Sequence, residues 1–130
     1  EGVCDLSLGN SYYLGKMLQD EEQKTWADAV YINFPNQKDR GAHVNVSGVV
    51  LTKYAKNKDA AVKLMEYLSA NKAQQMYAEL NMEYPVKTGV APSKLVASWG
   101  EFKADTLPIA QIASYRKQAI TLIDKVKFDL

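Results

Sequence analysis

The chain has 130 residues, of which 47% are hydrophobic and 24% are charged, and this composition is typical of a globular protein rather than of a disordered one. Sixteen basic residues against fifteen acidic ones leave a formal net charge of +1, which excludes a strongly basic surface for nucleic acid. No apolar run reaches the roughly 18 residues of a membrane-spanning helix, and a single cysteine, Cys4, excludes a disulfide within the chain.

The first half of the chain predicts strands around one helix. Residues 3–8 alternate like a strand almost from the start, so we expect a polypeptide that begins in mid-fold. Ser11 is the expected N-cap of a helix that ends in the charged stretch QDEEQK. Further strands are predicted at 29–34 and at 43–52, the second interrupted by Gly48.

The second half of the chain is predicted to be mainly helical. Asn57 and Asn71 are the expected N-caps of two amphipathic helices, and 81–94, with two prolines and a glycine, must be extended or looped. A helical pattern returns after residue 106 in one or two segments. Strands and helices that alternate without internal repeats indicate the α/β class.

Motifs of enzyme catalysis are missing from the sequence. It has no glycine-rich phosphate loop, no nucleophile elbow and no zinc-binding helix, and His43 is its only histidine. We interpret His43 as a hydrogen-bonding or packing residue and predict that the protein is not an enzyme.

Two adjacent tyrosines, Tyr12 and Tyr13, are the most unusual feature of the sequence, because neighbours on a helix diverge by about 100°. A phenolate is a hard oxygen donor that suits a hard cation such as Fe(III). The start of a helix also favours negative charge, and its first residue is not yet held to helical geometry. Paired phenolates on one ion are therefore plausible, although a Tyr-Tyr dipeptide is also a common accident.

Four motifs follow one another along almost the whole chain: GNSYYLGKM, the Ser-Gly at 47–48, NKD at 57–59 and EYP at 83–85. In this order and spacing they resemble the C-terminal portion of the periplasmic ferric-ion-binding proteins of iron ABC transporters. The resemblance implies a type II periplasmic-binding-protein fold of two α/β lobes that close on Fe(III), of which this chain holds parts of both lobes.

The resemblance also implies a site. Tyr12 and Tyr13 match the family's adjacent iron ligands, and Asn10 matches a residue that in some members contacts a synergistic anion such as carbonate, with Ser11 as an alternative. Arg40 and His43 match no family ligand. The remaining ligands would lie upstream of this chain.

Further expectations about the whole protein follow from the resemblance. Residues 1–42 would belong to the C-terminal lobe, 43–90 to the N-terminal lobe, and 91–130 again to the C-terminal lobe. Apolar faces would then need the missing N-terminal part of the protein, a swapped copy or another chain to cover them. The expected partner is an inner-membrane permease, and the expected location is the periplasm, with a signal peptide upstream.

Two other readings stay open on the sequence. One is a two-lobed receptor for a non-iron solute, such as a small anion or an organic cofactor, with Tyr12 and Tyr13 lining its pocket. The other is an enzyme or interaction module that shares only the α/β pattern.

Overall fold

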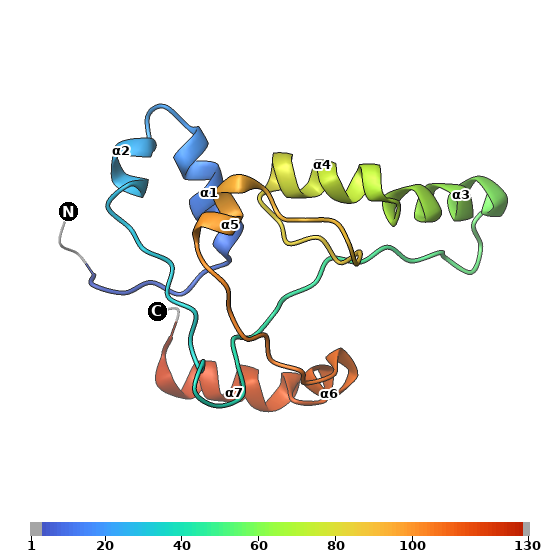
Figure 1. The fold of residues 1–130 in the computed structure, drawn as a ribbon. Helices are drawn as coiled ribbons and strands as arrows, with labels where there is room; N and C mark the ends of the chain where they lie inside the picture. Colours follow the sequence, from blue (N-terminus) through green and yellow to red (C-terminus); the bar gives the residue numbers. More distant parts are fainter. Residues whose placement is uncertain (1–3, 129–130) are drawn as a thin grey trace. The chain divides into compact units, whose positions relative to one another are not determined.

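The computed structural model describes residues 4–128, which form seven α-helices and two compact units (Figure 1). Unit 1 comprises the described residues up to 33 together with 45–101. Unit 2 comprises 34–44 together with the described residues from 102 onward. None of the helices within 4–128 combines the length and the apolar character that crossing a bilayer requires.

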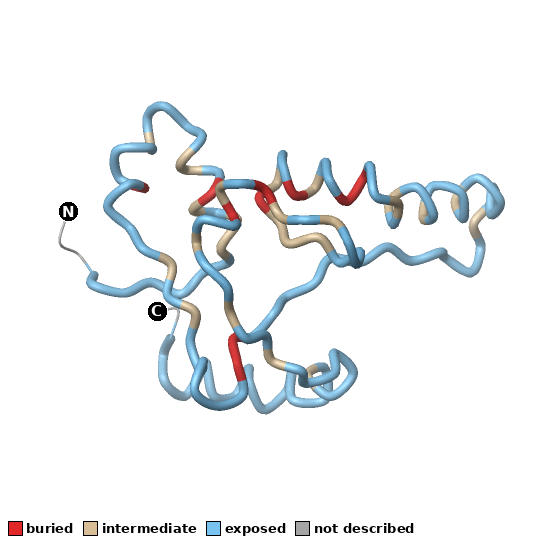
Figure 2. Tube along the Cα trace, viewed as in Figure 1, coloured by how far each residue is buried: buried red, intermediate tan, exposed pale blue. Residues whose placement is uncertain are grey.

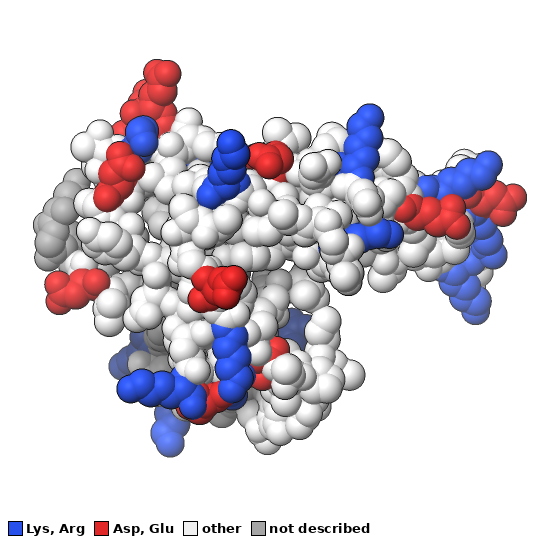
Figure 3. Space-filling model, viewed as in Figure 1, with Lys and Arg blue, Asp and Glu red and all other residues white. Residues whose placement is uncertain are grey.

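Unit 1 carries the first five helices, which are α1 (Ser11–Gln19), α2 (Lys24–Ala27), α3 (Lys58–Leu68), α4 (Asn71–Asn81) and α5 (Lys94–Ser98). Asp20 closes the turn between α1 and α2, because its carboxylate accepts hydrogen bonds from the N–H groups of Glu22 and Gln23 at 2.9 and 3.1 Å. Acidic side chains gather at this turn, while the face drawn in Figure 3 carries no continuous patch of either sign.

Gln74 joins α4 to the segments on both sides of it. Its side-chain Nε2 donates to the carbonyl of Leu68 at 2.9 Å, and its Oε1 accepts from the N–H of Val86 at 3.0 Å. The side chain is buried, so both hydrogen bonds are partly shielded from water. Gln74 therefore fixes the end of α3 and the extended segment after α4 against the same helix.

The buried core of the described chain is small (Figure 2). Its apolar members are mostly alanines, together with Met82 and the fully buried Val96. Large apolar side chains are exposed instead, including Leu6 at 87% and Val50 at 84%. Such exposure agrees with apolar faces that another piece of protein covers, and the identity of that piece stays a prediction.

The predicted strands are wrong for the described residues. Within 4–128 the segments 4–8, 29–34 and 43–52 belong to no β-ladder, and Val3 lies outside the described residues. The one β-bridge found there is parallel and isolated, between Ala42 and Ala104. Alternating apolar residues make a segment suited to a sheet, but a strand also needs a neighbouring strand for its N–H and C=O groups.

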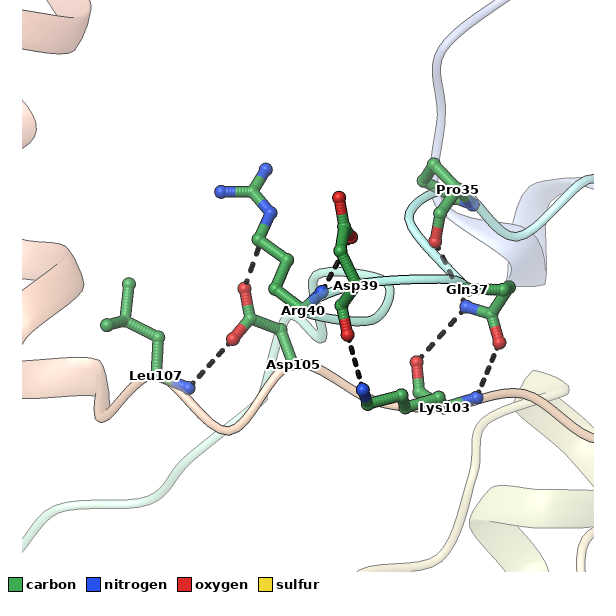
Figure 4. A network of polar contacts seen from close by, with 7 residues as sticks. All are labelled: Pro35, Gln37, Asp39, Arg40, Lys103, Asp105 and Leu107. Carbon is green, nitrogen blue, oxygen red and sulfur yellow. Dashed lines mark hydrogen bonds and ion pairs between the residues drawn. The ribbon is translucent and has the colours of Figure 1, made fainter.

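Unit 2 is built where 34–44 meets the chain that follows residue 101. The rings of Phe34 and Phe102 stack with centroids 4.3 Å apart, and Ala42 exchanges backbone hydrogen bonds of 2.8 Å with Lys103 and Asp105. Gln37, Asp39 and Arg40 add side-chain and backbone contacts to the same two segments (Figure 4). Two helices follow, α6 (Ile109–Ser114) and α7 (Arg116–Val126).

The predicted helices are present, with corrections at their ends. Ser11 and Asn71 are the first helical residues rather than the N-caps, which are Asn10 and Ala70. Asn57 is the N-cap of α3 as predicted, although its side chain makes no capping hydrogen bond. The helices α2 and α5 were not predicted, because four or five residues are too few to show a helical period.

Candidate functional site

The candidate site lies at the start of α1. Asn10 holds the extended backbone of an N-cap, with φ −75° and ψ 138°, and its carbonyl accepts a hydrogen bond from the N–H of Tyr13 at 3.2 Å. Ser11 begins the helix, and Tyr12 and Tyr13 complete its first turn. The chain thus changes from extended to helical at Asn10 and Ser11, immediately before the two phenols.

The two tyrosine rings lie against each other despite their consecutive positions. Their centroids are 4.5 Å apart and their planes are tilted by 45°. Asn10 Nδ2 donates a hydrogen bond to the Tyr12 hydroxyl at 3.3 Å. The structure therefore brings together three of the four residues singled out in the sequence, and the fourth, Ser11, lies between them in the chain.

The contact with Tyr12 changes the acidity of Tyr13. The pKa of Tyr13 is raised above its usual value of about 10, first by a hydrogen bond with Tyr12, then by charge repulsion from Tyr12 and by desolvation. Lys16 acts in the opposite direction and lowers the pKa of Tyr13. At neutral pH the Tyr13 phenol consequently keeps its proton, and a cation that binds its oxygen must displace that proton.

Lys16 is a member of the site that sequence reasoning missed. Its ammonium lies 5.5 Å from the centroid of the Tyr12 ring, close enough for a cation–π interaction. The two residues are four apart on α1, so they occupy neighbouring positions on its surface. That spacing was visible in the sequence and could have identified Lys16.

Arg40 and His43 belong to unit 2, whereas the tyrosine pair belongs to unit 1. Arg40 Nε lies 3.8 Å from a carboxylate oxygen of Asp105, and His43 is exposed. Within residues 4–128, no group of three His, Cys, Asp or Glu side chains comes close enough together to hold a metal ion.

An open hollow of about 440 Å³ lies elsewhere in unit 1. Neither Tyr12 nor Tyr13 lines it, and its wall is mainly apolar, with residues from α1, α5 and the segment after α2 such as Leu18, Val30 and Trp99. The idea that the phenols line an organic pocket gains no support from this hollow.

Comparison with known proteins places the chain in a family. Residues 7–104 match the family described as bacterial extracellular solute-binding proteins. The chain belongs to this family. Its membership of a solute-binding family agrees with the prediction that the protein is not an enzyme.

Curated relatives are named for iron. The chain is 49% identical over 113 residues to iron uptake protein A1 of Synechocystis, covering 85% of this chain and 31% of that protein. It is 27% identical over 124 residues to the major ferric iron-binding protein of Neisseria meningitidis serogroup B, covering 95% of this chain and 34% of the relative. The chain thus spans about a third of the length of these relatives.

Solved structures of iron-binding proteins have the same fold. Ferric iron-binding protein A of Mannheimia haemolytica, in an open conformation, matches 99% of this chain and 40% of its own, with 57% identity and a TM-score of 0.91. A Trichodesmium protein in complex with iron and citrate matches 91% of this chain and 38% of its own, with 40% identity and a TM-score of 0.84. The predicted type II periplasmic-binding-protein fold class is confirmed by this likeness.

Proposed function

We propose that the protein binds Fe(III) through the phenolate oxygens of Tyr12 and Tyr13 and hands the ion to a membrane permease of an ABC transporter. The observation that carries the proposal is the contact of the two rings, 4.5 Å apart at the first turn of α1. Further support comes from relatives named for iron uptake and ferric iron binding.

The chemistry of the pair suits a ferric cargo. Each phenol that binds the ion gives up its proton, so two binding phenols supply two negative charges to a trivalent cation. The free N–H groups and the dipole at the start of α1 favour those charges, and the Lys16 ammonium offsets part of their mutual repulsion. Softer divalent ions gain less from hard oxygen donors of this kind.

A synergistic anion completes the proposed site. Two phenolates leave a ferric ion with one positive charge and open coordination positions, which a small oxyanion such as carbonate fills. Asn10 and Ser11 carry a side-chain amide and a hydroxyl at the start of α1, where backbone N–H groups also favour an anion. A related Trichodesmium protein holds citrate together with iron.

The remaining parts of the proposal concern the whole protein. The protein works in the periplasm, to which a signal peptide directs it, and the other iron ligands come from the part of the protein upstream of this chain. That part, or a swapped copy, covers the exposed apolar residues of unit 1, and the two lobes divide this chain at residues 42 and 90. Leu6 and Val50, both more than four-fifths exposed, support the need for such a cover.

The experiment adds Fe(III) with bicarbonate or with citrate to the intact protein. Tyrosinate ligation is expected to give a visible charge-transfer band that Tyr12→Phe and Tyr13→Phe weaken or abolish. Tyr54→Phe, an exposed tyrosine outside α1, is the matched control and is expected to keep the band. A protein that takes up no Fe(III) with either anion would instead favour the receptor for a non-iron solute.

A further inference from the structure

Two residues of unit 1 occupy positions that their local backbone preferences oppose. Gly15 lies inside α1, although glycine is among the poorest helix formers. Met82 follows α4 in the left-handed conformation, with φ 57° and ψ 33°, which usually selects glycine at the end of a helix. Departures of this kind from local preference are expected where a tertiary contact or a function requires them.

The two residues contact each other. A Cβ atom on Gly15 would lie 2.5 Å from Met82 Cγ, 2.7 Å from Met82 Cβ and 3.3 Å from Cη2 of Trp99. Real Cβ atoms do not approach so closely, so the contact exists only because residue 15 has no side chain. Gly15 and Met82 are both buried in this contact, with Met82 only 3% exposed. We call Gly15, Met82 and Trp99 the α1 seat.

Met82 is itself held in place on several sides. Its backbone N–H donates to the carbonyl of Tyr77 in α4, and its sulfur accepts a hydrogen bond from Ser93 Oγ at 3.7 Å. Ser93 is the N-cap of α5, and its hydroxyl accepts from the N–H of Val96 at 3.2 Å. The end of α4 and the start of α5 therefore form a fixed surface, and α1 rests on it at Gly15.

The α1 seat lies one turn along the helix from Tyr12, because residues three apart share a face. We propose that Gly15 and Met82 are positioning residues for the tyrosine pair, and that their contact sets the rotation of α1 at which both phenol oxygens reach one ferric ion. The inference rests on the proposed function. It adds a specific requirement, namely that iron binding depends on a contact outside the coordination shell.

The proposed iron binding is sensitive to the rotation of α1, because the phenol oxygens of Tyr12 and Tyr13 must bind the same ion. A bound ion tolerates displacements of its ligands of only about 0.5 Å or 10–20°. The Tyr13 ring is 56% exposed, so packing around the ring itself does little to hold it. Tyr13 lies two residues from Gly15, about 200° around the helix, so the α1 seat fixes α1 from the side away from the Tyr13 ring.

The test uses three variants of the intact protein, Gly15→Ala, Met82→Gly and the double variant, with iron affinity and the charge-transfer band as readouts. Gly15→Ala introduces the overlap with Met82, and Met82→Gly removes the seat while suiting the left-handed backbone. Each single change is expected to shift the band and to weaken iron affinity by about 10- to 100-fold, as for other residues that orient metal ligands. The double variant is expected to regain affinity over Gly15→Ala, because the overlap is gone.

A matched control and a stability measurement complete the design. Gly9→Ala places a methyl group where no atom lies within 4 Å, and it is expected to leave the band and the affinity unchanged. Circular dichroism reports whether each variant is folded, and if Gly15→Ala does not fold, Met82→Gly decides the matter, since it introduces no overlap and glycine suits the left-handed backbone at residue 82. Folded single variants with the wild-type band and affinity would overturn the inference.

Failure of this inference can be told apart from failure of the proposed function. If Tyr12→Phe and Tyr13→Phe abolish the band while the seat variants keep it, only the role of the α1 seat is refuted. If the two tyrosine variants keep the band, the phenols are not the ligands, and both proposals fall together.

Discussion

Gln37 pairs with the backbone of Lys103 through both ends of its side-chain amide. The Oε1 atom accepts from the Lys103 N–H at 2.7 Å, and Nε2 donates to the Lys103 carbonyl at 3.2 Å (Figure 4). A side chain here does what a neighbouring strand does in a sheet, because it satisfies one donor and one acceptor of the same residue. It stands beside the isolated bridge between Ala42 and Ala104.

Replacing Gln37 is expected to loosen the segment that contains Lys103. Gln37→Ala removes both hydrogen bonds, each worth about 1 kcal/mol, so the Lys103 amide should exchange with solvent about five- to thirtyfold faster. Hydrogen exchange of the intact protein measures this locally. Gln37→Glu keeps the acceptor but loses the donor and should give a smaller effect, while unchanged exchange in Gln37→Ala would contradict the role of the amide.

Gln74 predicts an effect on global stability. Gln74→Ala leaves the carbonyl of Leu68 and the N–H of Val86 without this partner at a partly buried position, which should lower the free energy of unfolding by about 1–3 kcal/mol. Chemical denaturation of the intact protein measures the change. The neighbouring Gln75 is exposed, so Gln75→Ala is the control and should stay close to wild type.

The acidity of Tyr13 predicts how iron binding depends on pH. Its pKa is raised, so the phenol keeps its proton at neutral pH and binding must release it. With two phenols as ligands, iron affinity should fall as pH falls, by up to about 100-fold per pH unit. Competition titrations against a chelator of known pH dependence test this, and an affinity independent of pH would contradict phenolate ligation.

Replacing Lys16 should change the deprotonation of the Tyr13 phenol in the iron-free protein. Because its ammonium lowers the pKa of Tyr13, Lys16→Gln should raise that pKa further and move the phenolate absorbance of the iron-free protein to more alkaline pH. Lys16→Arg keeps the charge and should behave like wild type. Subtracting the titration of Tyr13→Phe isolates the contribution of Tyr13, and identical curves for the Gln and Arg variants would rule out this influence.

Replacing Asn10 should change the binding of the synergistic anion more than the binding of iron. Asn10→Ala removes the hydrogen bond to the Tyr12 hydroxyl and the proposed amide donor to the anion. We expect the bicarbonate concentration that half-saturates the charge-transfer band to rise by about tenfold, the lower limit for loss of a residue that supports a metal site. Equal dependence on bicarbonate in Asn10→Ala and wild type would exclude Asn10 from the anion site.

Long helices could be predicted from the sequence more easily than short ones. The helices α3 and α4 have eleven residues each and show a clear apolar period, so their existence could be predicted and only their first residues were uncertain. The short α5 shows no such period, yet Ser93 is its N-cap and accepts from Val96, so the Ser-Lys-Leu-Val sequence did carry a capping signal.

The strands and the α1 seat show what a sequence alone cannot give. Alternation at 43–52 specifies which side chains share a face, but it says nothing of whether a neighbouring strand is present to complete the ladder. Tyr12 and Tyr13 could be singled out because they are adjacent. The contact between Gly15 and Met82 joins residues far apart in the chain, and neither residue type by itself indicates the other.

The stack of Phe34 on Phe102 has a consequence for synthesis. Unit 2 takes its two parts from either side of residues 45–101, so its first part leaves the ribosome long before the second exists. The helices of unit 1 between them form from contacts that are closer in sequence and can assemble earlier. During translation, residues 34–44 therefore emerge well before the segment with which they pair in unit 2.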